Sequence, residues 1–120
     1  ALQCDLVVFS ELVITGYPPR DLLERKDFFN ANIVCLERLL NSIRGIGLIC
    51  GFVDKNFTGK GKPIHNTAIL FEDDNIIHKV HKRLLQTYDI FDEYRYFEPN
   101  TEFKIIEFKG KRIALTIAPL

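Results

Sequence analysis

The sequence predicts an α/β fold in which a helix covers one face of a β-sheet. Three observations lead to this prediction. Residues 5–10 form a nearly continuous apolar run rich in Val and Phe, which is typical of a strand buried on both faces. Residues 27–43 have apolar side chains at helical spacing, and a second apolar run follows at residues 46–53. After this strand, helix and strand, the rest of the chain shows only strand patterns. We therefore expect a single layer of helix on the sheet.

The link from the first strand to the helix contains the stretch Gly-Tyr-Pro-Pro at residues 16–19. Two consecutive prolines exclude a helix there and favour an extended turn. Asp21 can cap a short helical turn through residues 22–23. The apolar stripe of the following helix consists of Phe29, Ile33, Leu36, Leu40 and Ile43. Gly45 comes directly after this stripe and provides a C-terminal stop.

The second half of the chain begins with a loop and a hairpin. Residues 54–63 contain Gly59 and Gly61 and are expected to form an exposed loop. Strands are predicted at residues 66–72 and 76–82, because the Asp-Asp-Asn triplet between them is typical of a tight turn. Alternation in the second strand predicts one face with Ile76, His78 and Val80 and another with Ile77, Lys79 and His81.

The last third of the chain combines a long loop with a final strand pair. Residues 84–100 are aromatic and acidic without clean periodicity, and a loop of this length usually carries function. A strand pair is expected at residues 103–108 and 112–117, around Lys109 and Gly110. The apolar end of this pair needs both faces covered and no element follows it, so we expect an incomplete fold.

The composition excludes several classes of function. The 120 residues carry 16 Lys and Arg against 16 Asp and Glu, and zero net charge does not provide the basic surface of a general nucleic-acid binder. No apolar run is long enough to span a membrane. The three cysteines form no Cys-x-x-Cys pair, which argues against a disulfide framework or a cysteine zinc site. We therefore expect a cytoplasmic chain that binds neither nucleic acid nor membrane.

Three charged residues are candidates for catalysis. Glu11 directly follows a buried strand, where α/β proteins place ligands, and could serve as a general base; the alternative is a solvated loop carboxylate. Lys82 ends a strand and could stabilise an oxyanion; the alternative is a surface lysine. Glu93 lies among the aromatic residues 91–97, a pattern that suggests a lined pocket; the alternative is an ordinary amphipathic turn.

Other motifs carry little chemistry. His78 and His81 are three residues apart on a predicted strand and should point to opposite faces, which argues against a metal site. The Gly-Lys-Gly-Lys stretch at residues 59–62 lacks the P-loop spacing. The cysteines stand among apolar residues and are interpreted as inert core thiols; they are Cys4, Cys35 and Cys50. We expect no metal ligand in this chain.

Two long segments resemble motifs of the carbon–nitrogen hydrolase (nitrilase) superfamily. Residues 10–23 resemble the segment that carries its general base, and residues 82–97 resemble its lysine motif, with Gln86 in place of the usual proline. Residues 112–117 look like the strand that leads to the nucleophile. The continuation at residues 16–23 is similar to the glutaminase domains of glutamine-dependent NAD⁺ synthetases.

The resemblance implies a partial nitrilase-like αββα sandwich and a Glu-Lys-Cys triad. Residues 1–120 would form one glutaminase domain that is incomplete at both ends. Glu11 matches the general base, Lys82 the oxyanion-stabilising lysine, and Glu93 an acidic residue that orients the lysine. Tyr17 and Tyr88 match positions that line the glutamine pocket. The family has its nucleophilic cysteine where this chain has Ala118, so the resemblance supplies no nucleophile here.

The resemblance also implies a reaction and partners. A glutaminase of this kind releases ammonia from glutamine and needs no cofactor. A C-terminal synthetase domain then uses ATP and Mg²⁺ to amidate nicotinic acid adenine dinucleotide, and such enzymes form homo-oligomers. Two alternatives remain, a standalone amidase of the superfamily and a non-catalytic remnant. Because Ala118 cannot form a thioester, we expect these 120 residues alone to have no glutaminase activity.

Overall fold

A computed structural model of the chain describes residues 3–85, 93–100, 102 and 104–118. Within these residues the helical elements are the α-helix α1 (Lys26–Ser42) and 3-10 turns at Arg20–Glu24 and Glu93–Arg95. The strands are β1 (Leu6–Val8), β2 (Gly47–Lys55), β3 (Ile64–Glu72), β4 (Asn75–His81), β5 (Ile105–Phe108) and β6 (Lys111–Ala114). No helix in the described part of the chain is long and apolar enough to cross a membrane.

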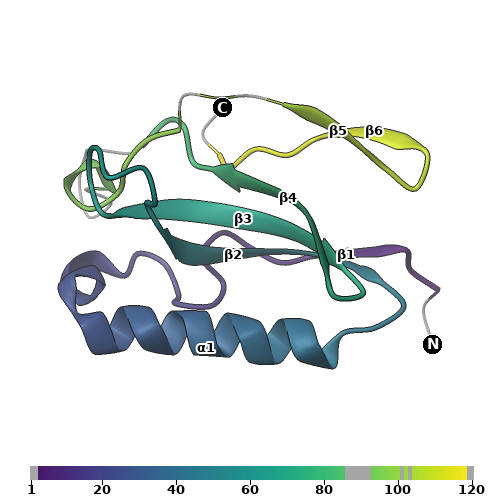
Figure 1. The fold of residues 1–120 in the computed structure, drawn as a ribbon, viewed down its shortest axis with the longest axis horizontal. Coiled ribbons are helices and arrows are strands. Elements are labelled where there is room, and N and C mark those ends of the chain that lie inside the picture. Colours follow the sequence, from purple (N-terminus) through teal and green to yellow (C-terminus); the bar gives the residue numbers. More distant parts are fainter. Residues whose placement is uncertain (1–2, 86–92, 101, 103, 119–120) are drawn as a thin grey trace.

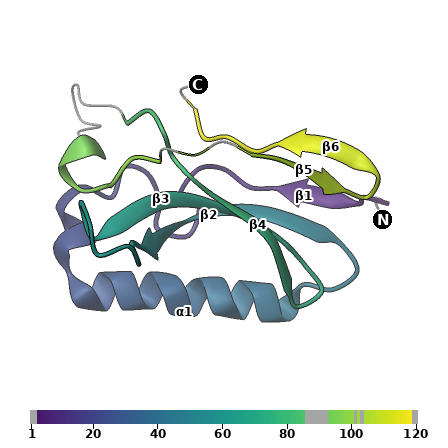
Figure 2. The same ribbon diagram turned by 45° about the horizontal axis from the view of Figure 1, so that its top comes forward.

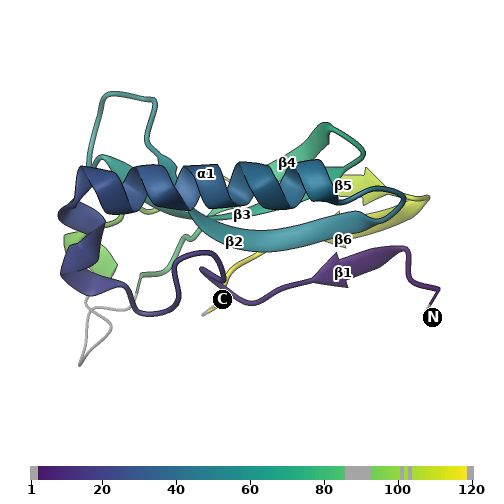
Figure 3. The same ribbon diagram turned by 90° about the horizontal axis from the view of Figure 1, so that it is seen from below.

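The elements form three layers, with a four-stranded sheet in the middle (Figure 1). The strand order is β1-β2-β3-β4; β1 runs parallel to β2, and the other pairs are antiparallel. Helix α1 connects β1 to β2 and lies along one face of the sheet (Figure 3). The β5–β6 hairpin lies over the opposite face (Figure 2).

Both faces of the central strands are buried, which explains why β2 and β3 read as continuous apolar runs. On the helix side, Leu48, Cys50 and Phe52 of β2 pack with Leu36 and Leu40 of α1. On the hairpin side, Ile49, Leu70 and Phe108 form a separate cluster. The alternation of β2 thus supplies one row of side chains to each layer.

The prediction that the first strand is buried on both faces is wrong. β1 is only three residues long, and the side chain of Val8 is 64% exposed. β1 is an edge strand, because the described sheet continues from it on one side only, to β2. An apolar run cannot by itself distinguish a central strand from an edge strand.

The predicted alternation of side chains between the two faces of β4 is correct only for the residues that follow a β-bulge. His78 pairs with Leu70 while Ile76 pairs with Phe71, so Ile77 is the extra residue. Directly paired residues share a face of the sheet. Ile76 therefore lies on the helix side with Phe71 and does not share a face with His78.

Candidate active site

The segment that carries Glu11 crosses directly over strand β2. Phe9 N donates to Ile49 O at 2.8 Å, and Ile14 N donates to Gly51 O at 3.3 Å. Leu12, between them, is fully buried. A Cβ atom on Gly51 would overlap the backbone nitrogen of Leu12 and approach the carbonyl carbon of Glu11 to 3.1 Å. The missing side chain of Gly51 therefore allows the Glu11 segment to lie against the sheet.

Lys82 directly follows strand β4 and is hydrogen-bonded to the neighbouring strand β3. Its backbone N donates to Asn66 O of β3 at 2.7 Å, directly after the end of β4. Its backbone O accepts from Asn100 N at 3.0 Å. The Lys82 side chain is 0% exposed, so its ammonium group depends entirely on protein partners. The interpretation of Lys82 as an ordinary surface lysine is therefore wrong.

Two carboxylates provide those partners. Lys82 Nζ lies 2.7 Å from Glu11 Oε1 and 2.8 Å from Glu93 Oε1. The Glu93 side chain is 2% exposed, while that of Glu11 is 26% exposed and so reaches solvent. The Tyr17 ring centroid is 5.7 Å from Lys82 Nζ, within the range of a cation–π contact. Glu11, Lys82, Glu93 and Tyr17 thus form one cluster, hereafter the Glu–Lys–Glu cluster; Tyr88 lies outside the described residues.

Sequence reasoning missed a fifth member of this cluster, Asn66. Asn66 Nδ2 donates to Glu11 Oε1 at 2.8 Å and to Glu93 Oε2 at 3.1 Å, and the residue is fully buried. Its Oδ1 atom is buried and has no hydrogen-bond partner among the described residues. An unpaired buried acceptor costs about 1–3 kcal/mol. An amide at the start of the apolar run 66–72 is the signal that could have drawn attention to it.

A cavity of about 250 Å³ adjoins Glu11 and brings the end of the described chain to the site. Its lining includes Ser10, Glu11 and Gly51 together with Leu115 to Ala118. Ala118, at the position that the resemblance assigns to the nucleophile, therefore shares a cavity with the candidate base.

The native cysteines do not supply the missing nucleophile. Cys50 also lines the cavity, but burial, with a smaller contribution from Cys35, raises its pKa from 9.0 to about 11. Its thiol therefore remains protonated and weakly nucleophilic near neutral pH. Cys4 and Cys35 are exposed, so the prediction that they are core thiols is wrong.

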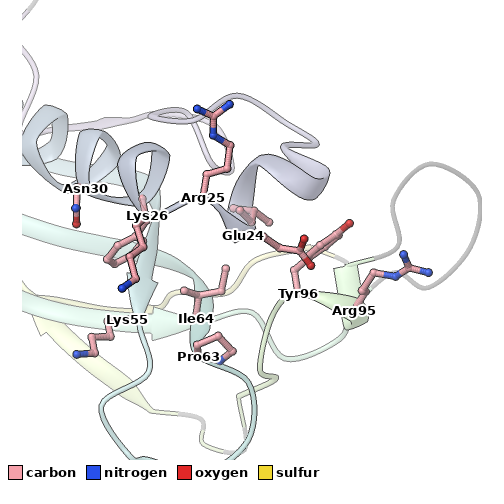
Figure 4. Close-up of a pocket in the computed structure, with 11 residues that line it drawn as sticks. Glu24, Arg25, Lys26, Asn30, Lys55, Pro63, Ile64, Arg95 and Tyr96 are labelled. Carbon is pink, nitrogen blue, oxygen red and sulfur yellow. The ribbon is translucent and has the colours of Figure 1, made fainter.

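A larger cavity, of about 520 Å³, lies at the start of α1 and contains none of the cluster residues. Its walls include Phe29 and Ile64, with the cationic residues Arg25 and Arg95 at its edge. These two side chains point outward in different directions (Figure 4). The charges do not converge on a common point, so we do not assign the chemistry to this cavity.

The residues that precede Asn66 and Lys82 also pack together. The rings of His65 and His81 stack with centroids 3.9 Å apart and an interplanar angle of 12°. His81 Nδ1 is 2.8 Å from Thr67 Oγ1. Burial lowers the pKa of His81 from 6.5 to about 4; His65 and Lys79 lower it further, and Asp54 opposes them. His81 is therefore neutral in the folded chain near neutral pH.

We expect the folded chain to lose stability as the pH falls from about 6.5 to about 4, because the unfolded chain protonates His81 first. The pKa of His81 is lower in the folded chain than in the unfolded chain. The contribution of neutral His81 to stability is therefore complete above the unfolded pKa, and it is lost as the pH falls through the folded pKa. The loss should be about 2 kcal/mol, below the full linkage value because the ring is partly solvated. Urea unfolding of the chain and of His81→Asn at both pH values measures it. His78→Asn is the comparison, because burial also lowers the pKa of His78 and its smaller effect is measured separately. Equal pH dependence in the chain and in His81→Asn would contradict the prediction.

The chain belongs to the carbon–nitrogen hydrolase family, because the family model matches residues 1–118. It is 33% identical over 115 residues to the glutamine-dependent NAD(+) synthetase of Thermotoga maritima, a match that covers 94% of this chain and 19% of that protein. The corresponding synthetase of Xylella fastidiosa is 35% identical, with 94% and 20% covered. The chain thus spans about a fifth of the length of these relatives.

Solved structures agree on the fold. A glutamine-dependent NAD⁺ synthetase from Acinetobacter baumannii superposes with a TM-score of 0.82 at 28% identity, over 93% of this chain and 20% of that chain. An amidase from Nesterenkonia sp. superposes with a TM-score of 0.74 at 20% identity, over 93% and 41%. The predicted α/β class and partial nitrilase-like sandwich are confirmed.

Proposed function

We propose that this chain is a fragment of the N-terminal glutaminase domain of a glutamine-dependent NAD⁺ synthetase. One observation carries the proposal: the buried Lys82 ammonium lies between Glu11 and Glu93, and Glu11 lines the cavity that also contains Ala118. The synthetase relatives named above favour this assignment over a standalone amidase. The residue roles below rest on the same observation.

The cluster has the parts that amide hydrolysis needs, apart from the nucleophile. With a thiol at position 118, Glu11 would take the thiol proton as sulfur attacks the glutamine side-chain carbonyl carbon. Lys82 would stabilise the resulting oxyanion, and Glu93 would orient Lys82. Glu11 would then return the proton to nitrogen as the C–N bond breaks. Ammonia would leave, and water would hydrolyse the thioester.

The same proposal includes the partners that this reaction requires. Glutamine would bind beside Tyr17, whose ring lies next to Lys82, and the role of Tyr88 stays a prediction. The ammonia would pass to a C-terminal synthetase domain that uses ATP and Mg²⁺, within a homo-oligomer. The extra length of the relatives leaves room for that domain. The unpaired cysteines fit a cytoplasmic location.

Ala118 favours a second candidate, a domain that binds glutamine without hydrolysing it. A methyl group cannot act as a nucleophile, so this chain would stop at binding. The two candidates share a glutamine pocket and differ in whether the site would support hydrolysis once a thiol stood at position 118. Introducing a thiol therefore distinguishes them. The thiol should become reactive if the other catalytic groups are in place, and it should stay unreactive if the catalytic geometry has been lost.

We expect Ala118→Cys to react covalently with a diazoketone analogue of glutamine, whereas the unchanged chain forms no adduct at this position. Peptide mass spectrometry locates the adduct, and Cys35 in the same molecule is the reference for an exposed thiol outside the site. Adding Glu11→Gln should slow the reaction at least about 100-fold, the range of general-base catalysis. If the introduced thiol reacts no faster than Cys35, the catalytic proposal fails.

A further inference from the structure

Asn66 closes the Glu–Lys–Glu cluster into a ring of hydrogen bonds. Lys82 Nζ donates to Glu11 Oε1 and Glu93 Oε1, and Asn66 Nδ2 donates to Glu11 Oε1 and Glu93 Oε2. The two carboxylates are therefore tied together twice, once through an ammonium group and once through an amide.

The two carboxylate oxygens of Glu11 differ in their hydrogen bonds. Both the 2.7 Å bond from Lys82 and the 2.8 Å bond from Asn66 end on Oε1. No described residue donates a hydrogen bond to Oε2. The Glu11 side chain is the one carboxylate of the cluster that remains partly exposed, and it lines the cavity shared with Ala118. Oε2 is thus the oxygen that is available to accept a proton.

The amide suits this task because it donates twice and carries no charge. The cluster contains two carboxylates and one ammonium group, which leaves one negative charge in excess. A second cation in place of Asn66 would balance that charge and weaken the base. A carboxylate there would supply no donor and would repel both glutamates.

We infer that Asn66 is a positioning residue that holds Glu11 Oε1, so that Oε2 serves as the basic atom toward position 118. The inference rests on the proposed function. Asn66 would act through Glu11 and would not touch the substrate. Its effect should therefore appear in the reactivity of a thiol at position 118 and in the order of the Lys82 ammonium group.

The test measures alkylation of the thiol in Ala118→Cys by iodoacetamide, relative to Cys35, from about pH 5.5 to 9, around the ordinary thiol pKa of about 8.5. At neutral pH we expect the introduced thiol to react at least about tenfold faster than Cys35, and Asn66→Ala to abolish this advantage. Asn66→Ser keeps one hydrogen-bond donor, so its alkylation rate should lie between those with Asn66 and with Asn66→Ala. Asn32→Ala is the matched control, because Asn32 is also a buried amide but bonds only to backbone, at Val53 and Phe29.

A second measurement needs no thiol at position 118. In the unmodified chain, labelled with ¹⁵N-lysine, the hydrogen-bonded Lys82 ammonium group should give a protected NMR signal. Asn66→Ala should remove this signal, and Asn32→Ala should retain it.

The outcomes separate the two proposals. Loss of both the ammonium signal and the alkylation advantage in Asn66→Ala alone supports the inference. A retained signal, or an unchanged pH profile of alkylation, overturns it. If the introduced thiol reacts no faster than Cys35 even with Asn66 present, the proposed function fails, and the ammonium signal alone decides whether Asn66 orders the cluster.

Discussion

Replacing Lys82 with methionine should destabilise the chain by about 3–5 kcal/mol, the usual cost of breaking a buried ion pair from one side. The Lys82 side chain is fully buried and lies within 2.8 Å of both glutamates. Methionine has a similar volume, so the packing changes little. The variant would leave two carboxylates facing each other, one of them only 2% exposed, without the cation between them. The cost is therefore electrostatic.

Urea unfolding at neutral pH measures this cost, and Lys109→Met is the matched control. The Lys109–Glu72 pair has the same 2.8 Å separation, but its side chains are 42% and 24% exposed. An exposed pair contributes little to stability because solvent screens it, so Lys109→Met should cost far less than Lys82→Met. Adding Glu93→Gln to Lys82→Met removes one of the two carboxylate charges that faced the ammonium group and should recover part of the loss. Equal effects of Lys82→Met and Lys109→Met would show that burial of the cluster does not govern its energy.

Gly51→Ala should cost about 2–3 kcal/mol, at the upper end for overpacking, because the added methyl group meets backbone. Its Cβ would overlap the backbone nitrogen of Leu12, and the Ser10 carbonyl oxygen would lie at 3.1 Å. The segment must move away from β2 to accept the methyl group, and Glu11 moves with it. The variant should therefore also disturb the bond between Lys82 and Glu11.

The control is Gly47→Ala on the same strand. Its Cβ would meet side-chain atoms of Phe108 and Leu6, at 2.5 and 3.1 Å. Both substitutions restrict the unfolded chain equally, so this contribution cancels in the comparison. Urea unfolding gives the two costs, and the NMR signal of the Lys82 ammonium group reports on the site. A retained ammonium signal in Gly51→Ala would contradict the proposed role of Gly51.

Much of the fold follows from local pattern. The apolar stripe predicted a helix at residues 27–43, and α1 spans Lys26–Ser42. The Asp-Asp-Asn triplet predicted the turn between β3 and β4, which the structure contains. These features depend on neighbouring residues, whose periodicity is visible in the sequence. The burial of β1 was predicted wrongly because it depends on the order of strands in the sheet, a property of distant segments.

The candidate site divides in the same way. The sequence by itself identified Glu11, Lys82 and Glu93, through their places after strands and in an aromatic segment and through their match to family motifs. Only the tertiary structure decided that Lys82 bonds to a residue 71 positions away and that Asn66 links both carboxylates. A single amide at the start of a predicted strand forms no motif. Its importance arises from burial and from two donors aimed at charged oxygens, which exist only when β3, β4 and the Glu11 segment come together.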